Sequence, residues 1–350
     1  MRDFSRAARQ AWAGPTPLAI PPAAPRTARA AATVAAVSAA LACTAFTGAG
    51  AAAVRRPPTW CKPGGTLTAR AMPQRIKIAD CDLRGRTVRG ANGLTATVPS
   101  DGTSLTAYAL RTDGAAELRI RVDSRAGEIS IGTQGDRVPQ GRPRQFRAPA
   151  AACQDGAYRP QPSRWPKGTT VQWSYYAGTA GLPRDPIARG VAAMPEARTD
   201  CTSAGRYTPR PDVGEHYAGQ TTRPPNVTSA AACGTRDRAN TFGWLAMPSA
   251  ETPVLAATCT WFSGPTTVET DMAVQSQGKR WWTGGTCPSG TYSAEAVAAH
   301  EAGHVFGLSH VEGAEHRSLT MTPSLASCDN GPATLGKGDY DGLIALYGGR

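Results

Sequence analysis

The sequence contains little histidine and no closely paired cysteines. Only five of its 350 residues are histidine. None of the nine cysteines forms a Cys-x-x-Cys pair or lies within two residues of a histidine, which argues against a thiolate zinc site. The arginines are scattered, with no basic stripe interleaved with aromatic residues, so nucleic-acid binding is not expected. The chain also lacks an internal repeat, which excludes a solenoid.

The composition is that of a globular protein rich in turns. Hydrophobic residues make up 41% of the chain, which is enough to bury a core. The 38 glycines and 29 prolines predict many turns and long loops rather than a helical bundle. A chain of this length can hold one large domain or two ordinary ones.

Residues 1–53 have the pattern of an export signal. Five arginines precede an uncharged run from Ala30 to Ala53 that ends in small residues, as in a cleaved signal peptide. An uncleaved membrane anchor and a lipoprotein signal remain alternatives. Without this segment the net charge of +12 falls to about +8, and eight cysteines remain. Their even number fits disulfides, with Cys61 paired to Cys81, and a secreted or extracellular protein, with anchoring at the cell surface as the alternative.

The rest of the chain divides by pattern into three parts. Residues 54–147 alternate apolar and polar side chains between turn residues, which predicts a small all-β module, interpreted as an inert pro-region or spacer. Residues 148–164 are predicted to be a linker. Residues 165–350 are predicted to form an α+β domain. Its expected elements are strands at 169–178, 240–248, 254–262 and 267–275, and helices at 185–198, from Ser293 onward, and up to Gly348.

Three of the five histidines lie in the stretch "HEAGHVFGLSH". On a helix, His300 and His304 project from one face and can reach one metal ion. Glu301 lies about 100° further around and can contact a water molecule beside that ion. Gly307 permits a left-handed exit from the helix, after which His310 can return as a third ligand. Three neutral imidazoles and a water molecule form an open zinc site of the catalytic type.

At these residues the chain resembles the metzincin zinc endopeptidases, whose pattern H-E-x-x-H-x-x-G-x-x-H it matches at every fixed position. "SLTMTPSL" supplies Met321 for the methionine turn of that family. Pro323 and "GDYDGLIALYG" make the subfamily similar to bacterial matrixins, over roughly Trp165 to Gly348. The resemblance implies a metzincin-type domain with a twisted mixed sheet, an active-site helix and a C-terminal helix, and one catalytic Zn²⁺. It also implies a peptide substrate laid as an extra strand along Val254 to Phe262.

The chain departs from the matrixin pattern in several places. Val311 stands where a serine is usual, and the histidine-rich loop for a second zinc is missing. The cysteine-containing latency segment is missing as well. The resemblance places the wall of the specificity pocket at about Val311 to Leu325. Calcium binding is left open, and Asp271 is either a calcium ligand or a turn cap, with the structural use favoured.

These observations predict a secreted zinc endopeptidase in which Glu301 activates the attacking water. The alternative is a cell-surface binding or adhesive protein with a non-cleaving metzincin-like domain. A third reading is a processing protease of narrow specificity. The expected partner is an extended peptide or protein substrate, with no nucleic acid and, once the leader is cleaved, no membrane. We expect a monomer.

Overall fold

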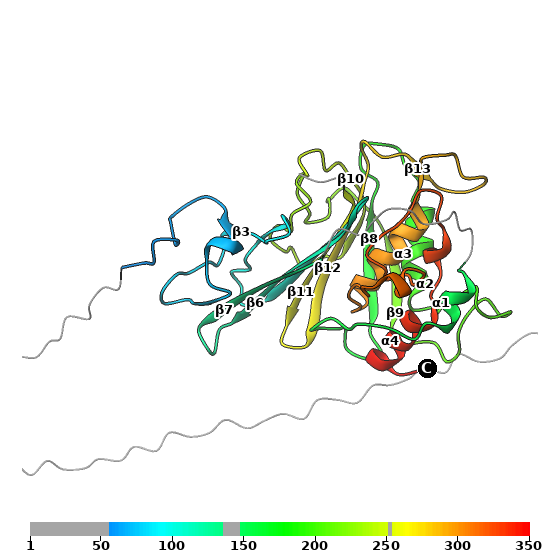
Figure 1. Ribbon diagram of the computed structural model, residues 1–350, viewed down its shortest axis with the longest axis horizontal. Coiled ribbons are helices and arrows are strands. Elements are labelled where there is room, and N and C mark those ends of the chain that lie inside the picture. The colour runs from blue at the N-terminus through cyan, green and yellow to red at the C-terminus, as the bar shows by residue number, and fades with distance from the viewer. Residues whose placement is uncertain (1–55, 136–147, 251–253) are drawn as a thin grey trace, which may run out of the picture. The chain divides into compact units, whose positions relative to one another are not determined.

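The computed structural model describes residues 56–135, 148–250 and 254–350, and the predicted leader lies outside them. A nine-stranded mixed sheet dominates the structure (Figure 1). Its strands are, in spatial order, β2 (Arg75–Lys77), β7 (Glu128–Gln134), β6 (Gly114–Asp123), β5 (Ser104–Arg111), β11 (Val254–Ser263), β12 (Thr266–Gln275), β10 (Thr241–Leu245), β8 (Thr170–Tyr176) and β9 (Gly214–Thr221).

Residues 148–350 contribute the five strands from β11 to β9. β11 and β12 form an antiparallel hairpin around Gly264, whose φ of +56° suits a glycine in a tight turn. β10 pairs in parallel with both β12 and β8, and β8 pairs in parallel with β9. Four of these strands, β8, β10, β11 and β12, agree with the predicted segments, whereas β9 was not predicted. The predicted mixed sheet with a few helices is confirmed.

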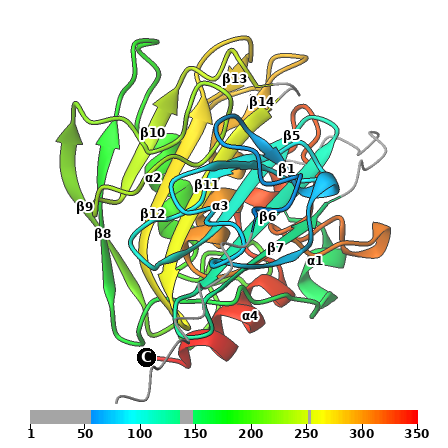
Figure 2. The same ribbon diagram turned by 90° about the vertical axis from the view of Figure 1, so that its left-hand side faces the viewer.

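The N-terminal strands continue the same sheet instead of folding apart. β5 runs antiparallel to β11 along its whole length, from Ser104 opposite Phe262 to Arg111 opposite Val254. β6, β7 and β2 follow outward. In Figure 2 the cyan strands β5, β6 and β7 lie on one side of the yellow strands β11 and β12. A separate all-β module is therefore not confirmed. β11, expected to be an edge strand, is a central strand.

The central strands β5, β11 and β12 are buried on both faces of the sheet, whereas β8 and β9 have one exposed face. One hydrophobic cluster lies between the sheet and the helices, around Trp173, Met272 and Leu343. A second cluster, around Leu105, Ile120 and the small strands β1 (Leu67–Thr68), β3 (Thr87–Arg89) and β4 (Thr95–Thr97), covers the opposite face. Successive side chains of a strand point to opposite faces, so β5 contributes to both sides.

The helices lie on one face of the sheet (Figure 1). They are α1 (Ala150–Gln154), α2 (Asp185–Ala193), α3 (Ala294–Val305) and α4 (Lys337–Tyr347). Ser293 caps α3, its hydroxyl accepting the Ala296 amide at 3.1 Å, as predicted. α2 ends before the predicted Arg198, because Pro195 cannot supply the next helical N–H. Gly190 lets α2 approach α3 closely, since a Cβ there would lie 2.6 Å from that of Ala298.

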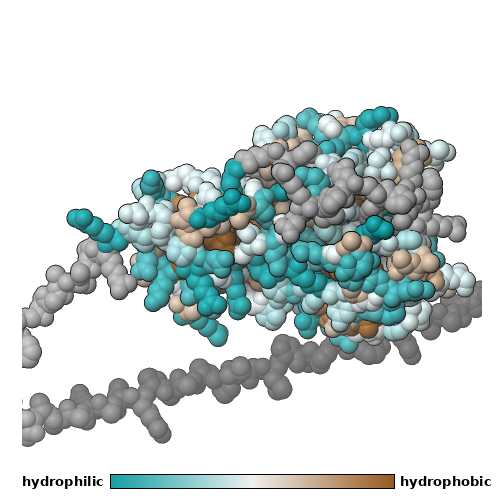
Figure 3. All heavy atoms as spheres, viewed as in Figure 1, coloured by the Kyte–Doolittle hydropathy of each residue, from teal (hydrophilic) through white to brown (hydrophobic). Residues whose placement is uncertain are grey.

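All eight cysteines outside the predicted leader form disulfides: Cys61–Cys81, Cys153–Cys201, Cys233–Cys259 and Cys287–Cys328. The predicted Cys61–Cys81 pair is confirmed. Within the described residues no helix combines the length and apolar character needed to cross a bilayer. The face in Figure 3 is largely hydrophilic, with only small apolar spots.

Candidate metal centre

Helix α3 and the loop after it bring the three predicted histidines together. His300 and His304 lie one turn apart on α3, and Gly307, with φ of +91°, turns the chain so that His310 faces them. The side-chain nitrogens of the three rings all lie within 4.8 Å of one another. Nε2 of His304 lies 3.0 Å from Nε2 of His310. Nε2 of His300 is buried and has no hydrogen-bond partner, which is the environment of a metal ligand without its metal.

Backbone carbonyls orient two of the rings. Nδ1 of His300 lies 2.8 Å from the Thr320 carbonyl, and Nδ1 of His304 lies 2.8 Å from the Leu308 carbonyl. A carbonyl only accepts, so each Nδ1 carries the proton and each Nε2 keeps its lone pair for a cation. The side-chain amide of Gln161 donates to the carbonyls of both His304 and Leu308 and fixes this turn.

Burial keeps the three imidazoles neutral. It lowers the pKa of His300 to about 4, although the Thr320 carbonyl acts in the other direction. Burial, together with the neighbouring rings, also holds the pKa values of His304 and His310 well below the ordinary value. Metal binding requires neutral imidazole, so these ligands need not lose a proton at neutral pH. The three residues fit a Zn²⁺ site.

Met321 lies directly beneath α3, at the predicted place. A Cβ on Gly303 would lie 2.0 Å from its sulfur atom, so this helix position requires glycine. Asp339 of α4 holds the turn, because its carboxylate accepts the amides of Thr320 at 2.8 Å, Gly336 at 2.9 Å and Met321 at 3.1 Å. Asp339 was not among the predicted site residues, although a carboxylate at the start of a C-terminal helix could have suggested it.

Glu301 is fully buried beside the histidines. Its Oε2 accepts the Thr258 hydroxyl of β11 at 2.6 Å, and its Oε1 has no hydrogen-bond partner. Burial raises its pKa to about 8, opposed by the Thr258 hydroxyl and the backbone amide of Leu110. The carboxylate thus has one oxygen held and one available for proton transfer.

Tyr108 of β5 covers the centre and was not among the predicted site residues. Its ring stacks on that of His304, with centroids 3.8 Å apart and planes 8° from parallel, and meets His310 edge-on. Its hydroxyl lies 3.2 Å from that of Ser309. One signal was present in the sequence, because Ser104 to Leu110 carries no charge on either face, as in strands buried on both sides.

A second group of carboxylates, from Asp237, Glu269 and Asp271, lies away from the histidines. Asp271 accepts the backbone amides of Asn226 and Thr241, each at 2.7 Å. Glu269 accepts two further backbone amides and the guanidinium of Arg236. These contacts support the structural use of Asp271 over calcium binding.

Comparison with known proteins agrees with this geometry over the last part of the chain. Residues 254–348, from the start of β11 to the end of α4, match the family model of the matrixins. A crystal structure of metalloproteinase-II from Bacteroides fragilis aligns with 75% of this chain and 91% of its own, at 11% identity and a TM-score of 0.29, a likeness too weak to carry an argument. No curated protein matches the sequence significantly. The region that holds the three histidines is therefore matrixin-like, of the metzincin type.

Proposed function

We propose that the chain is a secreted zinc-dependent endopeptidase that cuts peptide bonds with Glu301 as general base. The observation that carries the proposal is the convergence of three buried neutral imidazoles beside a buried carboxylate with one unpartnered oxygen. The matrixin match over the same residues supports it. Pairing of every cysteine outside the leader supports the secreted location.

His300, His304 and His310 would hold the ion through Nε2. When bound, Zn²⁺ would polarise the scissile carbonyl and acidify a neighbouring water molecule. The unpartnered Oε1 of Glu301 takes the proton of the attacking water and passes it to the departing amine nitrogen. Beside a bound cation, Glu301 would have a lower pKa than burial alone gives it, and it would act as a base at neutral pH.

Thr258 and Asp339 have positioning roles. The Thr258 hydroxyl fixes one carboxylate oxygen of Glu301, which leaves the other directed to the reacting water. Asp339 holds the Thr320 carbonyl that orients His300. Neither residue needs to touch substrate for its loss to slow the reaction.

The test uses the cut chain defined below, because the intact chain is expected to be latent. It compares the parent sequence with Glu301→Gln and with Glu196→Gln, a partly exposed control that pairs with Arg210. Zinc content is measured on all three, and cleavage of a quenched casein substrate is followed with and without a chelator. We expect about one zinc in each, with cleavage by Glu301→Gln slower by about 10³-fold. Equal activity of Glu301→Gln and parent would refute the proposal. If both the whole chain and the cut chain bind zinc but cleave no casein, the result would favour the alternative of a cell-surface binding or adhesive protein.

A further inference from the structure

We propose that strand β5 is an autoinhibitory segment, which occupies the peptide-binding groove of the proposed peptidase until the N-terminal region is removed. The N-terminal region denotes residues 56–135, and the C-terminal region denotes residues 148–350. The proposal rests on the proposed function for the meaning of the groove. It replaces the expectation of an inert spacer.

The main chain of β11 is already fully paired. β12 takes one side, and β5 takes the other from Phe262 to Val254, with a single irregularity between Val254 and Ala256. An extended peptide can add to a sheet only at a strand whose amides and carbonyls are free on that side. A substrate strand and β5 therefore exclude each other.

The side chains of β5 also fill the space above the histidines. Tyr108, opposite Thr258 in the strand register, places its ring against His304 and is 1% exposed. Two positions further on, Leu110 enters the hydrophobic cluster formed with the helices. Tyr108 and Leu110 face the site, whereas Leu105, Ala107 and Ala109 pack into the cluster on the opposite face. β5 thus covers the ligands and the base with both backbone and side chains.

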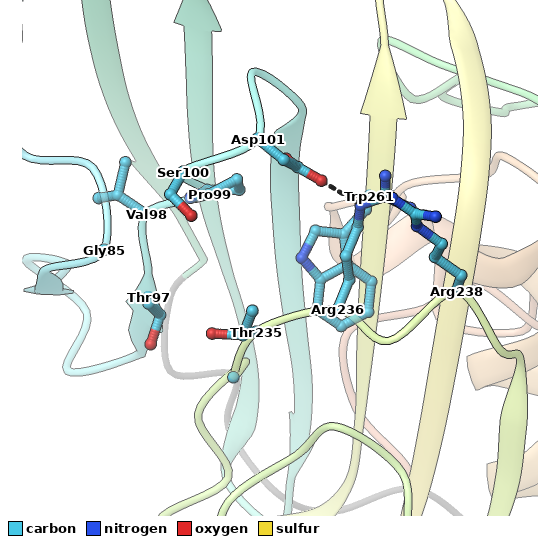
Figure 4. Close-up of a pocket in the computed structure, with 11 residues that line it drawn as sticks. Gly85, Thr97, Val98, Pro99, Ser100, Asp101, Thr235, Arg236, Arg238 and Trp261 are labelled. Carbon is cyan, nitrogen blue, oxygen red and sulfur yellow. Dashed lines mark hydrogen bonds and ion pairs between the residues drawn. The ribbon is translucent and has the colours of Figure 1, made fainter.

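No covalent bond other than the chain itself joins the two regions. Cys61–Cys81 lies within the N-terminal region, and the other three disulfides lie within the C-terminal region. The interface between them includes ion pairs from Asp101 to Arg236 and from Glu117 to Arg159. The packing of this interface is incomplete, because Asp101, Arg236 and Trp261 line a cavity of about 190 Å³ between the two regions (Figure 4). One cut between residues 135 and 148 would therefore leave the N-terminal region held only by noncovalent contacts.

The decisive experiment uses the whole chain with a recognition sequence for a sequence-specific protease inserted between residues 135 and 148. Intact and cut proteins are compared for casein cleavage and for binding of a fluorescent peptide with the sequence of Ser104–Arg111. We expect the cut protein to cleave at least about 100-fold faster, because latency requires that only about 1% of molecules be open. The peptide should bind the cut protein alone. The same peptide with alanine in place of the tyrosine should bind about tenfold more weakly.

The variant Tyr108→Ala, with Tyr108→Phe as its matched control, covers the case in which the cut pieces stay together. Truncation of a buried aromatic weakens the interface, whereas phenylalanine keeps the stacked ring. Size-exclusion chromatography reports whether the pieces separate. Pieces that remain joined in Tyr108→Ala overturn the proposal, because a strand that cannot leave cannot regulate.

The remaining outcomes separate this proposal from the proposed function. An intact chain that cleaves casein or binds the peptide as well as the cut chain overturns the inhibitory role of β5. Separated pieces that neither cleave nor bind the peptide overturn it as well. Peptide binding that appears on cutting without any cleavage supports the strand's role in the groove, while the proposed peptidase activity fails.

Discussion

Replacing Asp339 by asparagine tests how the C-terminal helix supports the metal centre. The carboxylate accepts three backbone amides and is 1% exposed. A carboxamide oxygen can accept two of them, but its NH₂ group then faces the third. One buried amide is left without a partner, at a cost of about 1–3 kcal/mol, and the other bonds lose their charge assistance. We expect the free energy of unfolding to fall by about 1–2 kcal/mol at pH 7, because asparagine also removes the cost of burying a charge and so offsets part of the loss.

The pH dependence gives a second, independent check on Asp339. Burial raises its pKa from 3.8 to about 6, although three amides oppose the shift. Between these values the folded state binds a proton that the unfolded state does not, so the parent gains stability as pH falls from about 6 toward 4. Asparagine does not titrate, so the variant gains no stability over this pH range. The difference between parent and Asp339→Asn should therefore widen by about 1 kcal/mol between pH 6 and pH 5.

The assay is urea unfolding of the parent, Asp339→Asn and the control Asp341→Asn, together with zinc affinity. Asp341 lies on the same helix, is partly exposed and pairs with Lys337, so its loss should cost less than about 1 kcal/mol. Zinc affinity should fall about tenfold in Asp339→Asn alone, because the Thr320 carbonyl orients His300. Equal stability of the two variants would refute the reasoning. A destabilised Asp339→Asn with unchanged zinc affinity would refute the link to the metal.

Three further predictions concern other parts of the molecule. Gly303→Ala should lower stability and zinc affinity, because its Cβ would lie 2.0 Å from the sulfur of Met321. The control Gly132→Ala should change neither, because no atom lies within 4 Å of the added Cβ. Urea unfolding and zinc titration of both variants test this prediction. Burial alone would raise the pKa of Asp101, but the Thr103 hydroxyl and the Arg236 guanidinium hold it at about 2. Ionised Asp101 therefore stabilises the folded state above about pH 4, and this contribution is lost as pH falls toward 2. The free energies of unfolding of the parent and Asp101→Asn should converge in acid. The change in their difference should be less than about 1 kcal/mol, because the pair is partly exposed. Chelation of the proposed zinc should lower the midpoint of thermal unfolding, and readdition should restore it, because an ion that binds only the folded state stabilises it by mass action.

The parts of the site that depend on local spacing were predictable from sequence. Four-residue spacing on a helix fixes His300 and His304 on one face, and a left-handed Gly307 returns His310, so no long-range information is needed. Ser293 as the helix cap follows from equally local chemistry. Most strands of the C-terminal part were predictable from alternation, since each carries its own period-two pattern, whereas the mixed pairing was expected only from the family resemblance.

The partners of these elements could not be read in the same way. Strand pairing between β5 and β11 joins segments far apart in the chain, and alternation does not name a partner. Thr258 and Tyr108 looked like ordinary strand residues until the pairing placed both beside Glu301 and the histidines. Gln161 fell in a segment predicted to be a linker, although that segment packs against α3.

The position of β5 in the sheet has a consequence for the kinetics of folding. Residues 104–111 are synthesised long before residues 254–263, yet each is the neighbour of the other in the finished sheet. Until β11 emerges, one long edge of the β5–β6–β7 sheet has unpaired amides and carbonyls, and Leu110 on strand β5 lacks the cluster that later covers it. Such long-range pairing forms slowly and leaves an aggregation-prone intermediate. The closing of β5 against β11 should therefore limit the rate of refolding, and its intermediate is where an overproduced chain would be lost to aggregation.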